Sequence, residues 1–137
     1  MIEIDGKNLD LETALTKEWI EANDLGGYAS STVVQCHTRK YHGLLVANLP
    51  SHGGRQVLLS KVEDSLVDEQ TETHFSVHKY PMVFSPEKIA KLQKVEFGTC
   101  LRFIYQYENS CVEKDILLCD GEDTLPVSYT HLRAHET

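Results

Sequence analysis

The sequence predicts a mainly β fold: an antiparallel β-sandwich, incomplete, with at most one or two short helices. Short runs of β-branched and apolar residues recur along the 137 residues, about eight in all. Turn signals rich in Gly, Asn, Asp and Pro separate these runs roughly every 8–12 residues. Nothing alternates helix and strand as a nucleotide-binding α/β fold would. The length fits one domain.

The first half of the chain contains the predicted turn and strand pair. Residues 9–20 fit helical spacing, although their end also suits the start of a strand. The NDLGG segment at 23–27 predicts a turn, because Asn, Asp and Gly tolerate left-handed backbone angles. Residues 29–35 and 41–48 read as strands, and 50–54 as another turn.

The second half predicts further strands and ends in a hairpin. Residues 56–67 favour one or two strands and 71–80 another. Residues 85–91 suit one helical turn, with a serine cap followed by proline. Apolar side chains alternate along 101–107, and 111–119 returns as the partner strand of an antiparallel hairpin.

Composition and charge exclude several classes of partner. The net charge is −8, and 13 Lys and Arg are scattered among 21 acids without a basic stripe, so no nucleic-acid partner is expected. The apolar runs are too short to span a membrane. Residues 1–5 lack the basic and apolar regions of a signal peptide, so we expect a cytoplasmic location.

No metal, cofactor or catalytic residue is predicted from the residue pattern. The four cysteines form no C-x-x-C pair and are expected to be free thiols. Cys36, His37 and His42 come nearest to zinc-ligand spacing but do not satisfy it. No spacing singles out a nucleophile with its base, and the 21 acids supply too many pairs to select a glycosidase pair.

The RKYHG segment at 39–43 is the most suggestive cluster. It places a cation, an aromatic ring and an imidazole beside a glycine at the start of a strand. Such groups suit a sugar, which offers hydroxyls to bond and an apolar face for stacking. The alternative, which chemistry alone favours, is that Tyr41 packs in the core and Arg39 pairs with a local acid.

Two long motifs occur in order and carry a resemblance to a known family. They are EWIEANDLGGYASSTV at 18–33 and TRKYHGLLVA at 38–47. Together with VLLSK at 57–61, EK at 113–114 and GEDT at 121–124, they resemble the N-terminal domain of bacterial and archaeal glycogen debranching enzymes, the amylo-α-1,6-glucosidase family. The resemblance covers residues 17–125. Asp24 stands where the family usually has Gly, and Ile20 replaces Leu.

The resemblance implies a β-sandwich that precedes an (α/α)₆ catalytic barrel in the same chain. The family hydrolyses α-1,6 branch points of glycogen and related α-glucans with carboxylates of that barrel, so no catalytic residue is carried over here. The motif positions carried over are structural or substrate-proximal: Asn23, Gly26, Gly27, Tyr28, Arg39, Tyr41, His42 and Gly43. The expected partners are the barrel and an α-glucan.

Three interpretations follow from this point. The first is a truncated, non-catalytic front domain, spanning residues 1–125, of a glycogen debranching enzyme. The second is a free-standing carbohydrate-binding module. The third is a purely structural domain in which the 39–43 segment supports the core and the hairpin.

The last residues fit nothing before them. VSYTHLRAHET at 127–137 resembles an in-frame translation of the adapter DNA used in transposon-based sequencing libraries. We therefore predict that residues 126–137 are adapter-derived, and we assign no function to the two histidines of this segment. The alternative is a genuine C-terminal strand.

Overall fold

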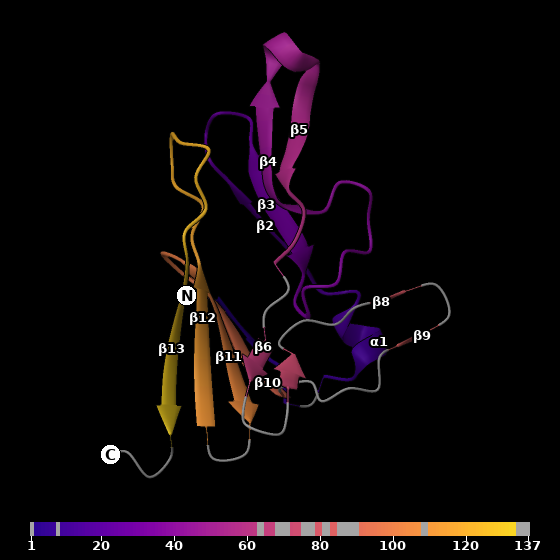
Figure 1. Ribbon diagram of the computed structural model, residues 1–137, viewed down its shortest axis with the longest axis vertical. Coiled ribbons are helices and arrows are strands. Elements are labelled where there is room, and N and C mark those ends of the chain that lie inside the picture. Colours follow the sequence, from indigo (N-terminus) through magenta and orange to yellow (C-terminus); the bar gives the residue numbers. More distant parts are fainter. Residues whose placement is uncertain are drawn as a thin grey trace.

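The computed structural model is built from two antiparallel sheets, with the β4–β5 hairpin projecting from one end (Figure 1). It describes residues 2–7, 9–62, 65–67, 72–74, 79–80, 83–84, 91–107 and 110–133. Sheet A has five strands, in the spatial order β1 (Ile2–Asp5), β10 (Lys91–Phe97), β11 (Leu101–Tyr107), β12 (Ser110–Ile116) and β13 (Val127–Arg133). Sheet B has four strands, in the order β2 (Glu18–Ala22), β3 (Tyr28–Thr32), β4 (Gly43–Leu49) and β5 (Gly54–Leu59).

Small elements surround these two sheets. The short helix α1 (Leu11–Ala14) is capped by Asp10, whose side chain accepts a hydrogen bond from the Thr13 amide at 2.7 Å. A 3₁₀ turn, η1 (Pro50–His52), joins β4 to β5. Two further short antiparallel pairs are β6 (Ser65–Val67) with β7 (Glu72–His74), and β8 (Lys79–Tyr80) with β9 (Val83–Phe84).

The two sheets share one hydrophobic core. Trp19 of β2 meets Phe103 of β11 edge to face, with ring centroids 6.4 Å apart. Ala29 on β3 and Val95 on β10 are fully buried in the same cluster. The expected mainly β fold with at most one or two short helices is therefore confirmed, and face-to-face packing of the sheets makes it a sandwich.

The predicted strands lie close to where the pattern placed them. The ambiguous stretch at 9–20 contains both alternatives, because α1 ends before β2 begins. The strand expected at 29–35 ends at Thr32 as part of β3, since Gln35 has a left-handed φ of 59°. Strands β1 and β10, which pair with each other, were not predicted. Residues 85–90, most of the expected helical turn, lie outside the described part of the chain.

The predicted hairpin is present, with Gln106 opposite Cys111 and Tyr107 opposite Ser110. The sequence pattern did not predict one residue of its inner face: Lys114, between Val112 and Ile116 on the same side of β12, is fully buried. The Lys114 ammonium donates to Gln35 Oε1 at 2.5 Å, and Gln35 Nε2 donates to the Tyr105 hydroxyl at 2.5 Å. These bonds join the β3–β4 loop to sheet A through the core.

The suspected adapter segment forms β13, the edge strand beside β12. Strand pairing uses backbone amides and carbonyls, which any sequence supplies, so pairing does not decide where these residues come from. The boundary between residues 125 and 126 stays a prediction.

Candidate functional site

The eight motif residues lie on sheet B or in its connecting loops, and six of them gather in two clusters. The turn cluster consists of Asn23, Gly26 and Gly27 with the 121–123 loop. The Glu18 cluster consists of Glu18, Arg39, Tyr41 and His42. Tyr28 and Gly43 open β3 and β4, the two central strands of sheet B.

Asn23 is the centre of the turn cluster and is completely buried. Its Oδ1 accepts hydrogen bonds from the backbone amides of Leu25 and Gly27, both at 3.0 Å. Its Nδ2 donates to the Glu122 carbonyl at 3.1 Å and to Asp123 Oδ1 at 2.8 Å. One amide side chain thus joins the β2–β3 turn to a loop about a hundred residues later, which fixes both segments.

The two glycines of this turn are needed for different reasons. Gly26 has a φ of +84°, a backbone conformation that side chains disfavour. A Cβ on Gly27 would lie 2.8 Å from the Val46 carbonyl oxygen and 2.9 Å from Asn23 Nδ2, so this position has no room for a side chain. Asp24, which departs from the family pattern, also has a positive φ of 65°, which explains why glycine suits that position.

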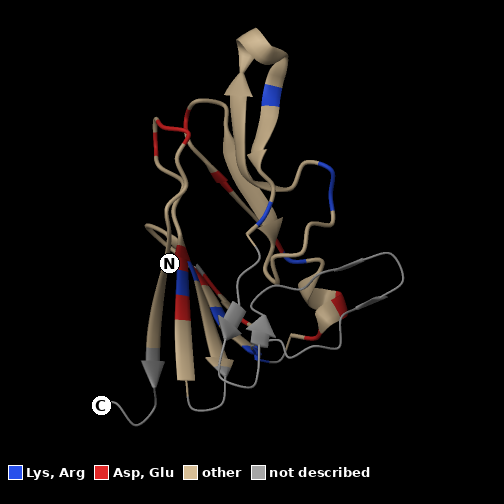
Figure 2. Ribbon diagram, in the orientation of Figure 1, with Lys and Arg blue, Asp and Glu red and all other residues tan. Residues whose placement is uncertain are grey.

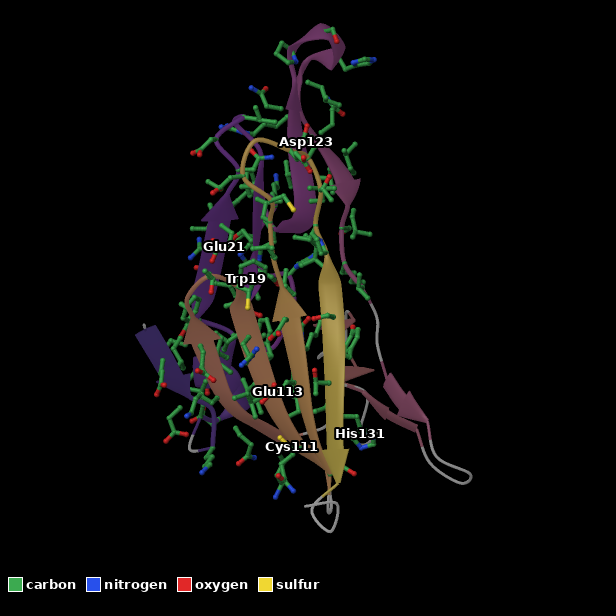
Figure 3. All side chains as sticks on the ribbon, turned by 90° about the vertical axis from the view of Figure 1, so that its left-hand side faces the viewer. Trp19, Glu21, Cys111, Glu113, Asp123 and His131 are labelled. Carbon is green, nitrogen blue, oxygen red and sulfur yellow. The ribbon has the colours of Figure 1, made fainter. Side chains whose placement is uncertain are left out.

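Acidic residues collect in and beside the turn cluster. Asp120, Glu122 and Asp123 form the red loop of Figure 2, and Figure 3 shows Asp123 toward the same end of the molecule as Glu21. Burial, and next the charge of Asp120, raise the pKa of the Glu21 carboxyl. The Glu21 carboxyl therefore keeps its proton to a higher pH than an isolated glutamate does.

In the Glu18 cluster, three side chains converge on one carboxylate oxygen. Glu18 Oε1 accepts from Arg39 Nε at 2.6 Å, from His42 Nε2 at 2.8 Å and from the Tyr41 hydroxyl at 3.2 Å. The Arg39 hydrogen bond is the main cause of a Glu18 pKa lowered to about 2. The carboxylate is therefore ionised at neutral pH and holds the β3–β4 loop against β2.

The two histidines of this loop are fixed in their tautomers by their partners. His42 Nδ1 accepts from the backbone amides of Thr38 and Arg39 at 3.0 and 3.3 Å, so Nε2 carries the hydrogen and donates a hydrogen bond to Glu18 Oε1. His37 has both ring nitrogens engaged, with Ser31 Oγ at 2.9 Å and the Ser60 carbonyl at 2.5 Å. Neither ring is arranged as a metal ligand or a general base.

Exposure separates the two clusters. Asn23 is buried, whereas Tyr41 is 45% exposed and the Arg39 side chain 58% exposed. The Arg39 guanidinium lies 6.0 Å from the centre of the Tyr41 ring. Of the two readings of the 39–43 segment, the ion pair of Arg39 with a local acid is present, but Tyr41 does not pack in the core.

Sequence reasoning missed Glu18 and Arg55. Glu18 opens the first motif, and the structure makes it the acceptor that organises the second. Arg55 on β5 donates Nε to the Gly26 carbonyl at 2.8 Å and lies 5.9 Å from the Tyr28 ring centre. Only the strand register brings Arg55 to this place, so no signal in the sequence could have found it.

The structure offers neither a metal-binding cluster nor a membrane-spanning helix among its described residues. Within the described ranges, no group of three or more His, Cys, Asp or Glu is placed to hold a metal ion. Among those same residues there is no helix long and apolar enough to cross a membrane.

Comparison with known proteins gives one family match. Residues 17–137 match the family model described as glycogen debranching enzyme N terminal. No curated protein and no solved structure matches the chain.

Proposed function

The chain belongs to the glycogen debranching enzyme N-terminal family, and from this premise we propose that it is the non-catalytic N-terminal domain of an enzyme that hydrolyses α-1,6 branch points of glycogen and related α-glucans. The partners in this proposal are a catalytic (α/α)₆ barrel of the same parent protein and an α-glucan chain. Four free cysteines are compatible with the reducing cytoplasm that we propose as the location.

The state of Glu18 carries the non-catalytic part of this proposal. A glycosidase needs one carboxyl that stays protonated to donate to the leaving oxygen, and a second carboxylate across the bond. Glu18 cannot donate that proton, because Arg39 keeps its pKa at about 2. It is also poorly placed as the second carboxylate, because its Oε1 already accepts hydrogen bonds from three side chains of the domain. The histidine of the 38–47 motif, His42, has both ring nitrogens engaged in internal hydrogen bonds. The motif residues thus hold the domain together and leave bond cleavage to another part of the parent enzyme.

A free-standing carbohydrate-binding module is the second candidate. Exposure of Tyr41 beside Arg39 favours it, because an aromatic ring with a neighbouring guanidinium suits a sugar. The two candidates differ in their need for a partner. A domain of an enzyme should bind the separately purified remainder of a parent enzyme, whereas an independent module should not.

Glucose release from an α-1,6-branched limit dextrin tests the proposal. The purified chain is expected to release none, at any pH between about 4 and 8, the range in which carboxyl pairs of glycosidases work. Turnover by the chain that disappears in the Glu21→Gln variant would contradict it, because Glu21 is the described carboxyl with a raised pKa in this region.

A further inference from the structure

The outer face of sheet B, turned away from the core, carries an aromatic and cationic surface. Cross-strand partners place their side chains on the same face of a sheet. Tyr28 of β3 is opposite Val46 of β4, and Val46 is opposite Val57 of β5. Arg55 precedes Val57 by two positions on the same strand, so it shares this face. The register therefore places Tyr28 and Arg55 together.

Two matched pairs of a tyrosine and an arginine make up this surface. The Arg55 guanidinium is 5.9 Å from the Tyr28 ring centre, and that of Arg39 is 6.0 Å from the Tyr41 ring centre. The Tyr28 hydroxyl donates to the Tyr41 carbonyl at 2.6 Å, and this bond connects the pair on β3 and β5 to the pair in the β3–β4 loop. We call these four residues the aromatic platform.

The arginines of the platform are held in place by one nitrogen each. Arg39 donates through Nε to Glu18 at 2.6 Å, and Arg55 donates through Nε to the Gly26 carbonyl at 2.8 Å. Both hydrogen bonds leave the terminal nitrogens, with two N–H donors apiece, for other acceptors. Because these side chains are already held in place, binding a ligand would cost little further side-chain entropy.

The surroundings of the platform favour a neutral ligand with apolar faces. Ile20 is 65% exposed on β2 and Val57 is 53% exposed on β5, so the platform has apolar neighbours on both sides. Glu18 neutralises Arg39. In Figure 2 the basic positions of β5 and of the β3–β4 loop (blue) lie apart from the acidic 120–123 loop (red). The chain as a whole nevertheless carries a net charge of −8, which repels anions. A polyanion is therefore disfavoured.

We propose that the aromatic platform is a binding subsite for a neutral α-glucan chain. The tyrosine rings would lie against the apolar faces of glucose units, and the guanidinium N–H groups would donate to their hydroxyls. The choice of α-glucan, as opposed to another neutral oligosaccharide, rests on the proposed function. The platform itself rests on the geometry of Tyr28, Tyr41, Arg39 and Arg55.

Titration of the full 137-residue chain with maltoheptaose by calorimetry tests this subsite. Saturable binding is expected, and Tyr41→Ala or Arg55→Ala should each weaken it about five- to tenfold, the effect of losing one aromatic or hydrogen-bonding contact. Tyr129→Ala is the matched control, because Tyr129 is 46% exposed but lies on sheet A. It should bind as the parent chain does. Thermal melting of each variant identifies any that fails to fold.

Two outcomes would overturn the proposal. One is a folded parent chain that shows no saturable binding of maltoheptaose. The other is binding that Arg55→Ala leaves unchanged, or that inorganic sulfate abolishes, which would make the surface an anion site. Tyr41→Phe, which keeps the ring, should retain affinity and serves where Tyr41→Ala is unstable. The glucose-release assay separates this result from the proposed function, since a chain that binds no glucan can still be non-catalytic.

Discussion

The turn cluster and the Glu18 cluster both draw on the 18–33 motif, yet they differ in how much of their surface a partner could reach. Asn23 is completely buried and uses both atoms of its amide group within the domain. Arg39 and Tyr41 also bond to the Glu18 carboxylate, but the Arg39 side chain is 58% exposed and Tyr41 as a residue is 45% exposed. The first cluster is closed and the second is open on one side.

The difference teaches that a strong motif does not by itself mark a ligand site. A buried polar group must find its partners inside the protein, and its loss then leaves other buried groups unsatisfied. An exposed group can form an internal bond and still offer donors to a ligand. We therefore expect changes in the turn cluster to reduce stability, and changes at the open side of the Glu18 cluster to reduce binding.

Replacement of Asn23 should have the largest effect. Asn23→Ala leaves the buried Gly27 amide without its acceptor and should lower the free energy of unfolding by about 2–4 kcal/mol. Asn23→Asp should be similarly damaging, because it places a carboxylate where an amide nitrogen now lies 2.8 Å from Asp123 Oδ1. Urea unfolding measures both losses.

Asp123→Asn is the matched control for this experiment. It keeps the side-chain oxygen that accepts from Asn23, so it should change stability by no more than about 0.5 kcal/mol. Wild-type stability of Asn23→Ala would show that the turn cluster does not hold the domain together.

The glycines should rank next. Gly27→Ala forces a Cβ against the Val46 carbonyl, and we expect a loss of about 2–3 kcal/mol from the backbone shift that follows. Gly54→Ala provides the comparison, because Gly54 has a φ of +102° but nothing within 4 Å of its Cβ. It should cost only about 1–2 kcal/mol of backbone strain. Equal losses in thermal melting would rule out the steric explanation for Gly27.

Glu18→Gln should give a loss that depends on pH. Arg39 chiefly lowers the Glu18 pKa from 4.5 to about 2 in the folded chain, so the carboxylate stabilises the fold at pH values above 4.5. That stabilisation is lost as the pH falls toward 2. The melting temperature of Glu18→Gln should therefore be lower than that of the parent chain at pH 7.

The difference in melting temperature should shrink as the pH falls from about 4.5 to about 2, the window set by the two pKa values. Glu12→Gln removes the same charge from an exposed position on α1 and should show no such trend. A difference that stays constant down to the acid limit would mean that Glu18 is not held by Arg39 in solution.

Tyr41→Ala should have the smallest effect on stability. The side chain is 45% exposed, and its hydroxyl makes only a long bond of 3.2 Å to Glu18, so the change should be within about 0.5 kcal/mol. The Tyr28 bond to the Tyr41 backbone carbonyl does not depend on the replaced side chain. A large drop in the free energy of unfolding, measured in urea, would show that Tyr41 is needed for stability. The Glu18 cluster would then not differ from the turn cluster in its role.

The sequence predicted the sheets better than it predicted the contacts between them. Alternation of apolar residues along 101–107 depends on neighbours within one strand, and the strand lies where that pattern placed it. The two motifs also located the turn and the β3–β4 loop. Burial of Lys114 and the position of Arg55 depend instead on which strands meet across space. No local pattern encodes those pairings, so these residues came only from the structure.

The most direct test of the contrast is a heteronuclear NMR titration of the chain with maltoheptaose, following every backbone amide. We predict shift changes at Tyr41 and Arg55 on the aromatic platform, and none at Asn23 or in the 121–123 loop. Slow hydrogen exchange of the Gly27 amide, whose acceptor is Asn23 Oδ1, should persist throughout. Shift changes centred on the turn cluster, with the platform unaffected, would contradict this account.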